Sequence, residues 1–300
     1  MNATAFLGDK PVNRMGYGAM QLAGPAVFGL PDNPEGARAV LRRAVELGVD
    51  HIDTSQYYGP DVVNDLIRQA LYPYPDNLKL VTKVGARRDA AGRVLPAQRP
   101  DELRKGVEAN LHTLRVERLD LVNLRRVETA RDDAVPLEEQ LLALADMRAE
   151  GKLDLIGLSN VGPAKAELAL QFVDVAEIQN GYSIIDRRDE DTLEFARGRG
   201  IAYVPFSPLG SSYRAGTRQL AADATIVEIA DKHEATPAQI ALAWLLARYD
   251  RLLLIPGTSS TVHLEENMAA AELELDDFDL LALDRVGRST DPARGARAKR

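Results

Sequence analysis

The sequence contains no cysteine. This absence excludes disulfide bonds, thiol nucleophiles and thiolate metal sites. No apolar run reaches the roughly 18 residues that a membrane-spanning helix requires, so we predict no such helix and no membrane partner. Residues 1–10 also lack the basic start and apolar stretch of a secretory signal, which makes the cytoplasm the expected location.

The chain also has fewer basic than acidic residues. Lys and Arg number 37 against 45 Asp and Glu, for a net charge of −8. This acidic balance argues against nucleic acid as a partner. The basic ending "ARGARAKR" is interpreted as part of a solvated tail over about residues 287–300. No internal repeat or low-complexity linker divides the chain, so a single domain over residues 1–300 is predicted.

Short apolar stretches and longer segments of helical period alternate along the chain. Fully apolar runs of this length suit strands that are buried on both faces of a parallel sheet. Eight strands are predicted, at residues 14–20, 49–53, 78–84, 119–124, 153–159, 175–180, 201–207 and 252–257.

Helices are predicted between these strands. Residues 34–47 carry apolar side chains along one stripe, and residues 101–115 and 138–150 show the same period. A further helix begins with Thr236 as its N-cap and a proline at its first position. We expect Trp244, on that helix, to lie in the core.

Eight strands that alternate with helices over about 250 residues indicate a closed (β/α)8 barrel. Residues 1–13 are expected to form a hairpin that plugs one end. The main alternative, an open doubly wound sheet, needs a G-x-G-x-x-G fingerprint after its first strand. The stretch "GYGAMQ" lacks the third glycine. Long irregular segments at 86–100, 126–137 and 207–218 are expected to be active-site loops.

Polar residues end most of the predicted strands, and in a barrel these ends meet at the catalytic mouth. Asp53 and Lys83 end adjacent strands, and Tyr57 and Tyr58 follow the first of them. A tyrosine has a pKa of about 10, and a neighbouring ammonium stabilises its phenolate. Asp53 would hold Lys83 in place, so the three residue types together make a proton donor. The residues alone do not decide between the two tyrosines, and a purely structural Asp53–Lys83 ion pair is the simpler alternative.

The motifs, taken in order, resemble those of the aldo-keto reductase family. "HIDTSQYYG" precedes a "TK" pair, and "GLSN", "IQN", "FSPLG" and "IPGTSSTVHLEEN" follow, over about residues 12 to 286. The resemblance implies an NADPH-dependent reductase of an aldehyde or ketone, with an Asp, Tyr, Lys and His tetrad and no metal. A finer resemblance to the bacterial pyridoxal reductase-like branch suggests pyridoxal as the small-molecule carbonyl substrate.

Carried over residue by residue, the resemblance implies that Asp53, Tyr58 and Lys83 are catalytic. The family spacing selects Tyr58, which leaves Tyr57 to pack or to line the substrate pocket. This chain departs from the family at the fourth position, where Arg125 stands in place of the histidine.

Arginine stays protonated, so Arg125 cannot shuttle a proton. It can donate hydrogen bonds to a carbonyl oxygen. We therefore expect catalysis to survive, with Arg125 as the electrophile. An ion pair between Arg125 and Glu128 at the rim is the alternative.

The resemblance also implies a cofactor site. Its residues are Gly18, Ala19, Met20, Ser159, Asn160, Gln179, Phe206, Ser207, Pro208, Leu209, Gly210, Gly257, Thr258, Ser259, Ser260, His263, Glu266 and Asn267. Within this set, Ser159, Asn160 and Gln179 would hold the nicotinamide carboxamide. Phe206 would stack on the nicotinamide ring, and residues 207–210 would approach the pyrophosphate. Residues 258–263 would meet the 2′-phosphate at a helix start, and residues 266–267 would meet adenine.

Two positions depart from the family in the phosphate region. Many members use Lys and Arg where this chain has Gly257 and His263. Hydroxyls and backbone amides also bind phosphate, so NADPH is expected ahead of NADH. A regulatory NADPH-binding barrel with weak turnover, and a phosphate-binding isomerase or lyase, are the alternative functions. The expected assembly is a monomer or a weak homo-oligomer.

Overall fold

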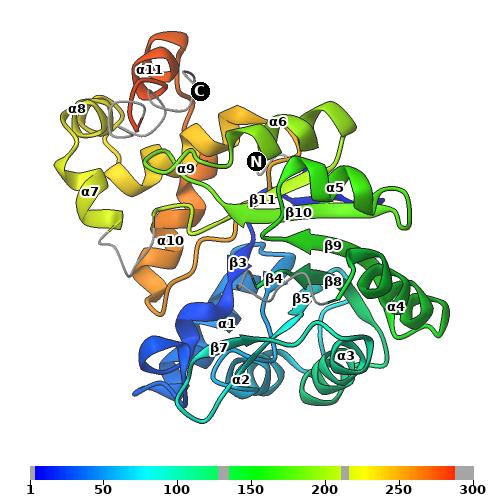
Figure 1. Ribbon diagram of the computed structural model, residues 1–300. Helices are drawn as coiled ribbons and strands as arrows, with labels where there is room; N and C mark the ends of the chain where they lie inside the picture. Colours follow the sequence, from blue (N-terminus) through cyan, green and yellow to red (C-terminus); the bar gives the residue numbers. More distant parts are fainter. Residues whose placement is uncertain (1–3, 128–134, 211–215, 288–300) are drawn as a thin grey trace.

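Seven parallel strands form one curled sheet in the computed structural model, which describes residues 4–127, 135–210 and 216–287. The strands are β3 (Tyr17–Gly18), β4 (His51–Asp53), β5 (Lys79–Val84), β8 (Leu119–Arg125), β9 (Leu153–Ser159), β10 (Val175–Gly181) and β11 (Ala202–Phe206). Their order in the sheet is β11-β10-β9-β8-β5-β4-β3. Helices surround the sheet (Figure 1).

The eighth predicted strand closes the barrel through isolated parallel bridges. Leu252 bridges Tyr203 of β11, and Leu254 bridges Met15 just before β3. The N–H of Gly16 donates to the Leu254 carbonyl at 2.8 Å. The predicted (β/α)8 barrel is therefore confirmed.

The strands predicted at 14–20 and 252–257 are much shorter than expected. A Cβ on Gly18 would lie 2.5 Å from the Ile255 carbonyl oxygen, and one on Gly257 would lie 2.7 Å from the Gly18 carbonyl oxygen. The two backbones thus touch directly where the barrel closes. Beyond Gly18 the chain turns at once into a 3-10 helix, Ala19–Leu22.

The predicted helices are confirmed to within a residue or two. They are α1 (Pro34–Glu46), α3 (Pro100–Leu114), α4 (Leu137–Ala149) and α9 (Pro237–Arg248). The others are α2 (Val62–Leu71), α5 (Pro163–Ala169), α6 (Glu190–Arg199), α7 (Gly216–Ala222), α8 (Ala224–Lys232), α10 (Thr261–Ala269) and α11 (Asp277–Leu283). Trp244 is fully buried, as predicted. Over the described ranges, no helix combines the length and apolar character needed to cross a membrane.

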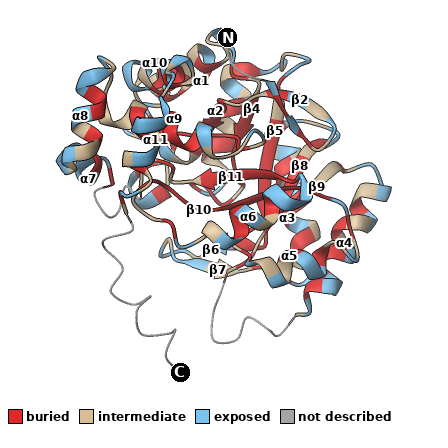
Figure 2. Cartoon of the chain, turned by 90° about the horizontal axis from the view of Figure 1, so that it is seen from above, coloured by how far each residue is buried: buried red, intermediate tan, exposed pale blue. Residues whose placement is uncertain are grey.

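A hairpin covers the amino end of the barrel. Strands β1 (Thr4–Leu7) and β2 (Lys10–Asn13) pair antiparallel. Leu7 and Val12 pack in one cluster with Val81 and Leu121 from inside the sheet. The predicted plug is confirmed, which leaves the carboxyl ends of the strands as the open face. Figure 2 shows the buried strands at the centre and helices with exposed outer faces.

The segment 86–100 is not the irregular loop that was predicted. Strands β6 (Ala86–Arg88) and β7 (Val94–Pro96) form a second hairpin there. Asp89 stabilises its turn, because one carboxylate oxygen accepts from the N–H groups of Ala91 and Arg93. Of the other two predicted loops, residues 128–134 and 211–215 lie outside the described residues, as does the predicted tail beyond Gly287.

Candidate active site

The carboxyl ends of β4 and β5 bring Asp53 and Lys83 together inside the barrel. Lys83 Nζ donates to Asp53 Oδ1 at 2.5 Å, and the two side chains are only 4% and 5% exposed. Lys83 Nζ also donates to the Thr54 carbonyl at 3.0 Å, and Gln179 Nε2 donates to Asp53 Oδ2 at 2.8 Å. A buried ion pair needs such additional hydrogen bonds to offset the loss of water. Both members of the Asp53–Lys83 pair therefore have an additional hydrogen bond that offsets their burial.

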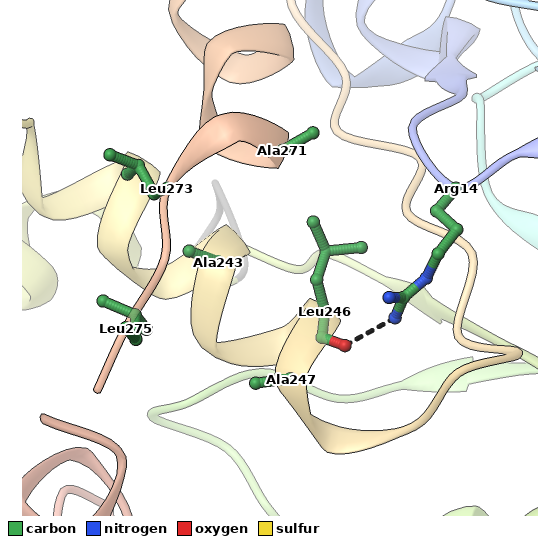
Figure 3. A pocket seen from close by; sticks show the side chains of 7 residues that line it. All are labelled: Arg14, Ala243, Leu246, Ala247, Ala271, Leu273 and Leu275. Carbon is green, nitrogen blue, oxygen red and sulfur yellow. Dashed lines mark hydrogen bonds between the residues drawn. The ribbon is translucent and has the colours of Figure 1, made fainter. Parts of the chain in front are cut away.

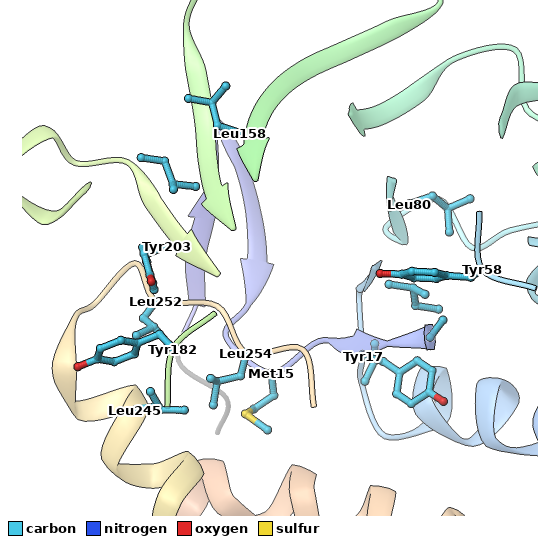
Figure 4. Close-up of a cluster of buried hydrophobic side chains, with 14 of the residues drawn as sticks. Met15, Tyr17, Tyr58, Leu80, Leu158, Tyr182, Tyr203, Leu245, Leu252 and Leu254 are labelled. Atoms are coloured by element: carbon cyan, nitrogen blue, oxygen red, sulfur yellow. The ribbon is translucent and has the colours of Figure 1, made fainter. Parts of the chain in front are cut away.

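Tyr58 is the tyrosine that contacts the ammonium. Lys83 Nζ lies 5.0 Å from the centroid of the Tyr58 ring, and Tyr57 packs edge-on against that ring with centroids 5.2 Å apart. Burial raises the pKa of Tyr57 to about 12, so Tyr57 is a weaker acid than an ordinary tyrosine. Figure 4 draws Tyr58 and Tyr17 with their hydroxyls pointing in different directions. Tyr17 donates its hydroxyl to the Thr258 carbonyl at 2.5 Å.

Arg125 is the last residue of β8 and joins three strand ends. Its Nη1 donates to Ser159 Oγ on β9 at 3.1 Å, and its guanidinium carbon lies 4.9 Å from the centroid of the Phe206 ring on β11. The predicted alternative partner, Glu128, lies outside the described residues. A guanidinium carries five N–H donors. The Arg125 guanidinium can therefore donate to Ser159 and also to an oxygen of a bound molecule.

Three of the predicted cofactor residues sit at the neighbouring ends of β9 and β10. Ser159 and Gln179 are fully buried. Asn160 follows β9 with a left-handed backbone (φ 63°), and its Nδ2 donates to the Arg126 carbonyl at 2.9 Å. Gln179 Oε1 is buried and accepts no hydrogen bond within the described part of the chain. An unpaired buried acceptor costs free energy, which makes this oxygen a candidate ligand contact.

The segment from Phe206 to Gly210 forms a turn at the end of β11. A Cβ on Gly181 would lie 3.0 Å from the Phe206 ring, so the ring packs closely against Gly181 of β10. The N–H of Gly210 donates to the Ser207 carbonyl at 2.8 Å. Ser207 has φ 54°, a conformation that is strained for a residue with a side chain and that clusters at functional sites. Pro208 and Leu209 complete the turn.

The segment from Gly257 to Asn267 leads into α10. Ser260 caps the helix, because its Oγ accepts from the His263 N–H at 3.4 Å, and its own N–H donates to Thr258 Oγ1 at 3.1 Å. Gly257 lies against the Gly18 carbonyl, so a larger residue does not fit there without a shift. This contact gives a physical reason for the glycine at a position where lysine was expected from the family.

Glu177 and Asn123 were not predicted as site residues. Asn123 Nδ2 on β8 donates to Glu177 Oε1 on β10 at 2.6 Å, and both side chains are buried. Burial raises the pKa of Glu177 to about 7. The available signal was a single carboxylate inside the apolar stretch "VAEIQN", two residues before Gln179.

A separate hollow lies against α9, and its lining is apolar except for Arg14. It is lined by Arg14, by Ala243, Leu246 and Ala247 of α9, and by Ala271, Leu273 and Leu275 (Figure 3). The Arg14 guanidinium donates to the Leu246 and Tyr249 carbonyls at 2.5 and 2.7 Å. These are carbonyls at the end of α9, so Arg14 acts as a helix C-cap.

Fold and site together define a (β/α)8 barrel enzyme whose open face holds a tyrosine, an ammonium, a carboxylate and a guanidinium. Within residues 4–127, 135–210 and 216–287, no group of three or more His, Asp or Glu side chains is arranged to hold a metal ion. Acid–base chemistry is what such a set of side chains supports.

Comparison with known proteins identifies the family. The model of the aldo/keto reductase family matches residues 14–288. Over 293 residues the chain is 48% identical to pyridoxine 4-dehydrogenase from Escherichia coli (strain K12), covering 96% of this chain and 100% of that protein. It is 37% identical over 298 residues to an uncharacterized oxidoreductase of Schizosaccharomyces pombe, covering 99% and 94%. This chain belongs to the aldo/keto reductase family of oxidoreductases.

Solved structures agree with this assignment. A thermostable aldo-keto reductase in complex with the inhibitor epalrestat superposes with a TM-score of 0.81 at 29% identity, covering 94% of this chain and 98% of the other. The glycerol dehydrogenase AKR11B4 from Gluconobacter oxydans shares the fold with a TM-score of 0.82 at 22% identity, covering 97% and 98%.

Proposed function

We propose that this chain uses NADPH to reduce an aldehyde or ketone to the alcohol, with Tyr58 as the proton donor. The observation that carries the proposal is the position of Lys83, which contacts both Asp53 and the Tyr58 ring inside the barrel. When the carbonyl oxygen takes the Tyr58 proton, the adjacent ammonium stabilises the phenolate that remains. Asp53 keeps Lys83 oriented through the contact at 2.5 Å.

Arg125 is proposed to polarise the carbonyl. Negative charge grows on the carbonyl oxygen as the carbon is reduced, and a fixed N–H donor stabilises that charge. Ser159 and the Phe206 ring hold the guanidinium in place. Because arginine does not release its proton, Arg125 serves as a donor only, and Tyr58 remains the acid.

The residues predicted to hold the cofactor fit that task. Gln179 Oε1 is a buried acceptor in need of a donor, and the N–H of a nicotinamide carboxamide would supply one. Ser159 and Asn160 stand at the neighbouring strand end. Bound NADPH supplies the hydride that reduces the carbonyl carbon.

The start of α10 is the proposed site of the 2′-phosphate. Thr258, Ser259, Ser260 and His263 gather around the first turn, where backbone N–H groups and the helix dipole favour an anion. Glu266 and Asn267, one turn further along α10, are the proposed contacts of adenine. This arrangement supports NADPH ahead of NADH, although Gly257 and His263 replace the basic residues expected from the family.

Pyridoxal is the proposed substrate, with pyridoxine as the product. The support is the 48% identity to a protein named pyridoxine 4-dehydrogenase, which extends over the whole of that relative. The same site can run in either direction, because a phenolate at Tyr58 can take back the proton of the alcohol.

The test is a reductase assay that follows the loss of reduced-nicotinamide absorbance. The substrates are pyridoxal, a nitrobenzaldehyde and a simple ketone, with NADH replacing NADPH as a control. Rapid turnover of pyridoxal supports the whole proposal, and turnover of the nitrobenzaldehyde alone refutes the substrate but keeps the enzyme. Binding of NADPH without turnover of any substrate would refute the reductase and favour a regulatory barrel.

Two matched tyrosine variants test the proton donor. Tyr58→Phe should lose reduction while its NADPH affinity stays nearly unchanged, because the hydroxyl acts only in the transition state. Tyr57→Phe, the adjacent control, should retain most of kcat. The opposite pattern would assign the proton donor to Tyr57.

A further inference from the structure

A second carboxyl lies inside the barrel, two residues before Gln179 on β10. We propose that this residue, Glu177, is a positioning residue: it holds Gln179 against Asp53, and its charge state sets the net charge around Lys83. The inference rests on the proposed reductase function and extends it to a group outside the Asp, Tyr, Lys and Arg set.

Gln179 bridges the two buried carboxyls. Its Nε2 donates to Asp53 Oδ2 at 2.8 Å and to Glu177 Oε1 at 3.4 Å. A side-chain amide has two N–H donors, so each carboxyl receives one of them. With the nitrogen committed on both sides, Oε1 is the side-chain atom of Gln179 that remains for a ligand, since no described residue donates to it. Glu177 therefore fixes which way the Gln179 amide faces.

The barrel wall is built to admit the Glu177 side chain. A Cβ on Gly157 of β9 would lie 2.2 Å from Asn123 Oδ1 and 3.0 Å from Glu177 Cγ. Only the absence of a side chain at Gly157 lets Asn123 on β8 reach Glu177 on β10, where they meet at 2.6 Å. The pairing of β10 with β9 also shifts register between Val175 and Ile178, next to Glu177.

The charges around Glu177 do not balance when it is ionised. Asp53 faces it from β4 and Lys83 from β5, while its neighbours on β8, β9 and β11 are Asn123, Gly157 and Ala202, which do not ionise. Protonated Glu177 leaves one carboxylate for one ammonium. Ionised Glu177 adds an unpaired negative charge, which opposes formation of the Tyr58 phenolate and slows reduction.

This change falls in the neutral pH range. Burial raises the pKa of Glu177 to about 7, the Asp53 charge adds to the rise, and Lys83 opposes it. As pH rises through this value, Glu177 ionises. The rate of reduction should then fall, by on the order of tenfold for one added charge inside a protein.

Glu177→Gln is the main test, because it keeps an oxygen for Asn123 and removes the ionisation. Wild-type kcat for pyridoxal reduction should step down as pH rises through neutrality, and the variant should show no step. Below the step, the two proteins should agree within about twofold. The control is Asp120→Asn: burial also raises the pKa of Asp120, whose Oδ2 accepts from the Leu80 N–H at 2.9 Å near the amino end of the barrel. That variant should keep the step.

A second readout does not depend on turnover. In the cofactor-free protein, the raised pKa means that the folded state holds a proton which the unfolded state releases above about pH 4.5. Wild type should therefore lose thermal stability as pH rises from 4.5 to 7, relative to Glu177→Gln. Unfolding can be followed by the fluorescence of Trp244, the single tryptophan.

NADPH affinity separates positioning of Gln179 from the charge effect. Glu177→Leu removes the acceptor of the Gln179 amide. This variant should bind NADPH about tenfold more weakly, because the amide loses one hydrogen bond that orients it. Glu177→Gln should bind NADPH as wild type does. Equal affinity in all three proteins would refute the positioning role.

The remaining outcomes are also decisive. If Glu177→Gln keeps the wild-type pH step and the wild-type slope of stability against pH, Glu177 does not titrate there and the charge role is wrong. If wild type reduces none of the carbonyls, the proposed function fails, but the stability and NADPH measurements still test Glu177 separately.

Discussion

Replacing Lys83 with methionine isolates the energetic value of the buried pair. Methionine keeps most of the side-chain length but removes the ammonium. Asp53, whose side chain is 5% exposed, then keeps the Gln179 amide as its side-chain partner among the described residues. Removing one partner of a buried pair costs about 3–5 kcal/mol. At about 2–4 °C per kcal/mol for a chain of this size, the melting temperature should fall by on the order of 10 °C. The same variant should lose nearly all reductase activity, because Tyr58 loses its cation.

The loss of stability comes from the carboxylate that is left without its cation. Without Lys83, the Asp53 carboxylate loses the ammonium at 2.5 Å that offsets its burial. Urea unfolding, followed by Trp244 fluorescence, measures the lost stability directly.

The double variant Asp53→Asn with Lys83→Met supplies the control. It removes both charges, so it should recover most of the stability that either single variant loses. The reasoning would be refuted if Lys83→Met unfolds within about 1 kcal/mol of wild type and the two substitutions are additive. That result would mean that water reaches the pair and screens it.

Three further predictions concern other parts of the chain. Arg125→Met should lower kcat by about 10²-fold, the usual effect of losing one donor to a developing oxyanion, and Arg125→His should stay active in the same steady-state assay; loss of all activity in Arg125→His would mean that the substrate needs the guanidinium. Gly257→Ala should destabilise by about 1–3 kcal/mol through overpacking against Gly18, and an unchanged melting temperature would contradict the tight closure. Thr236→Ala, which removes the cap of α9, should cost about 1 kcal/mol in urea unfolding and leave kcat unchanged.

Much of the fold follows from local sequence pattern. The strands β9 and β10 are short, mostly apolar stretches between helices, and both begin at the residue that the pattern predicts. Apolar runs identify strands because a barrel strand is buried on both faces. The helix α9 is set by its N-cap threonine and following proline, which act within one turn. Local pattern does not predict the bounds of β3, because the strand is limited by contact between the backbones at Gly18 and Gly257. It also misses the β6–β7 hairpin, whose turn is stabilised by the Asp89 carboxylate.

The alternation of strands and helices is enough to predict the barrel and the contact between Asp53 and Lys83, because adjacent parallel strands end at one face. The tyrosine beside Lys83, and the contacts of Arg125 with Ser159 and Phe206, become visible once the chain is folded. It also revealed the Asn123–Glu177 contact, which joins residues 54 positions apart across a glycine on the strand between them. Local sequence pattern indicates whether a side chain is buried. Which residue it contacts depends on packing between segments that are far apart in the sequence. At Gly157, the missing Cβ leaves room for the hydrogen bond between Asn123 and Glu177.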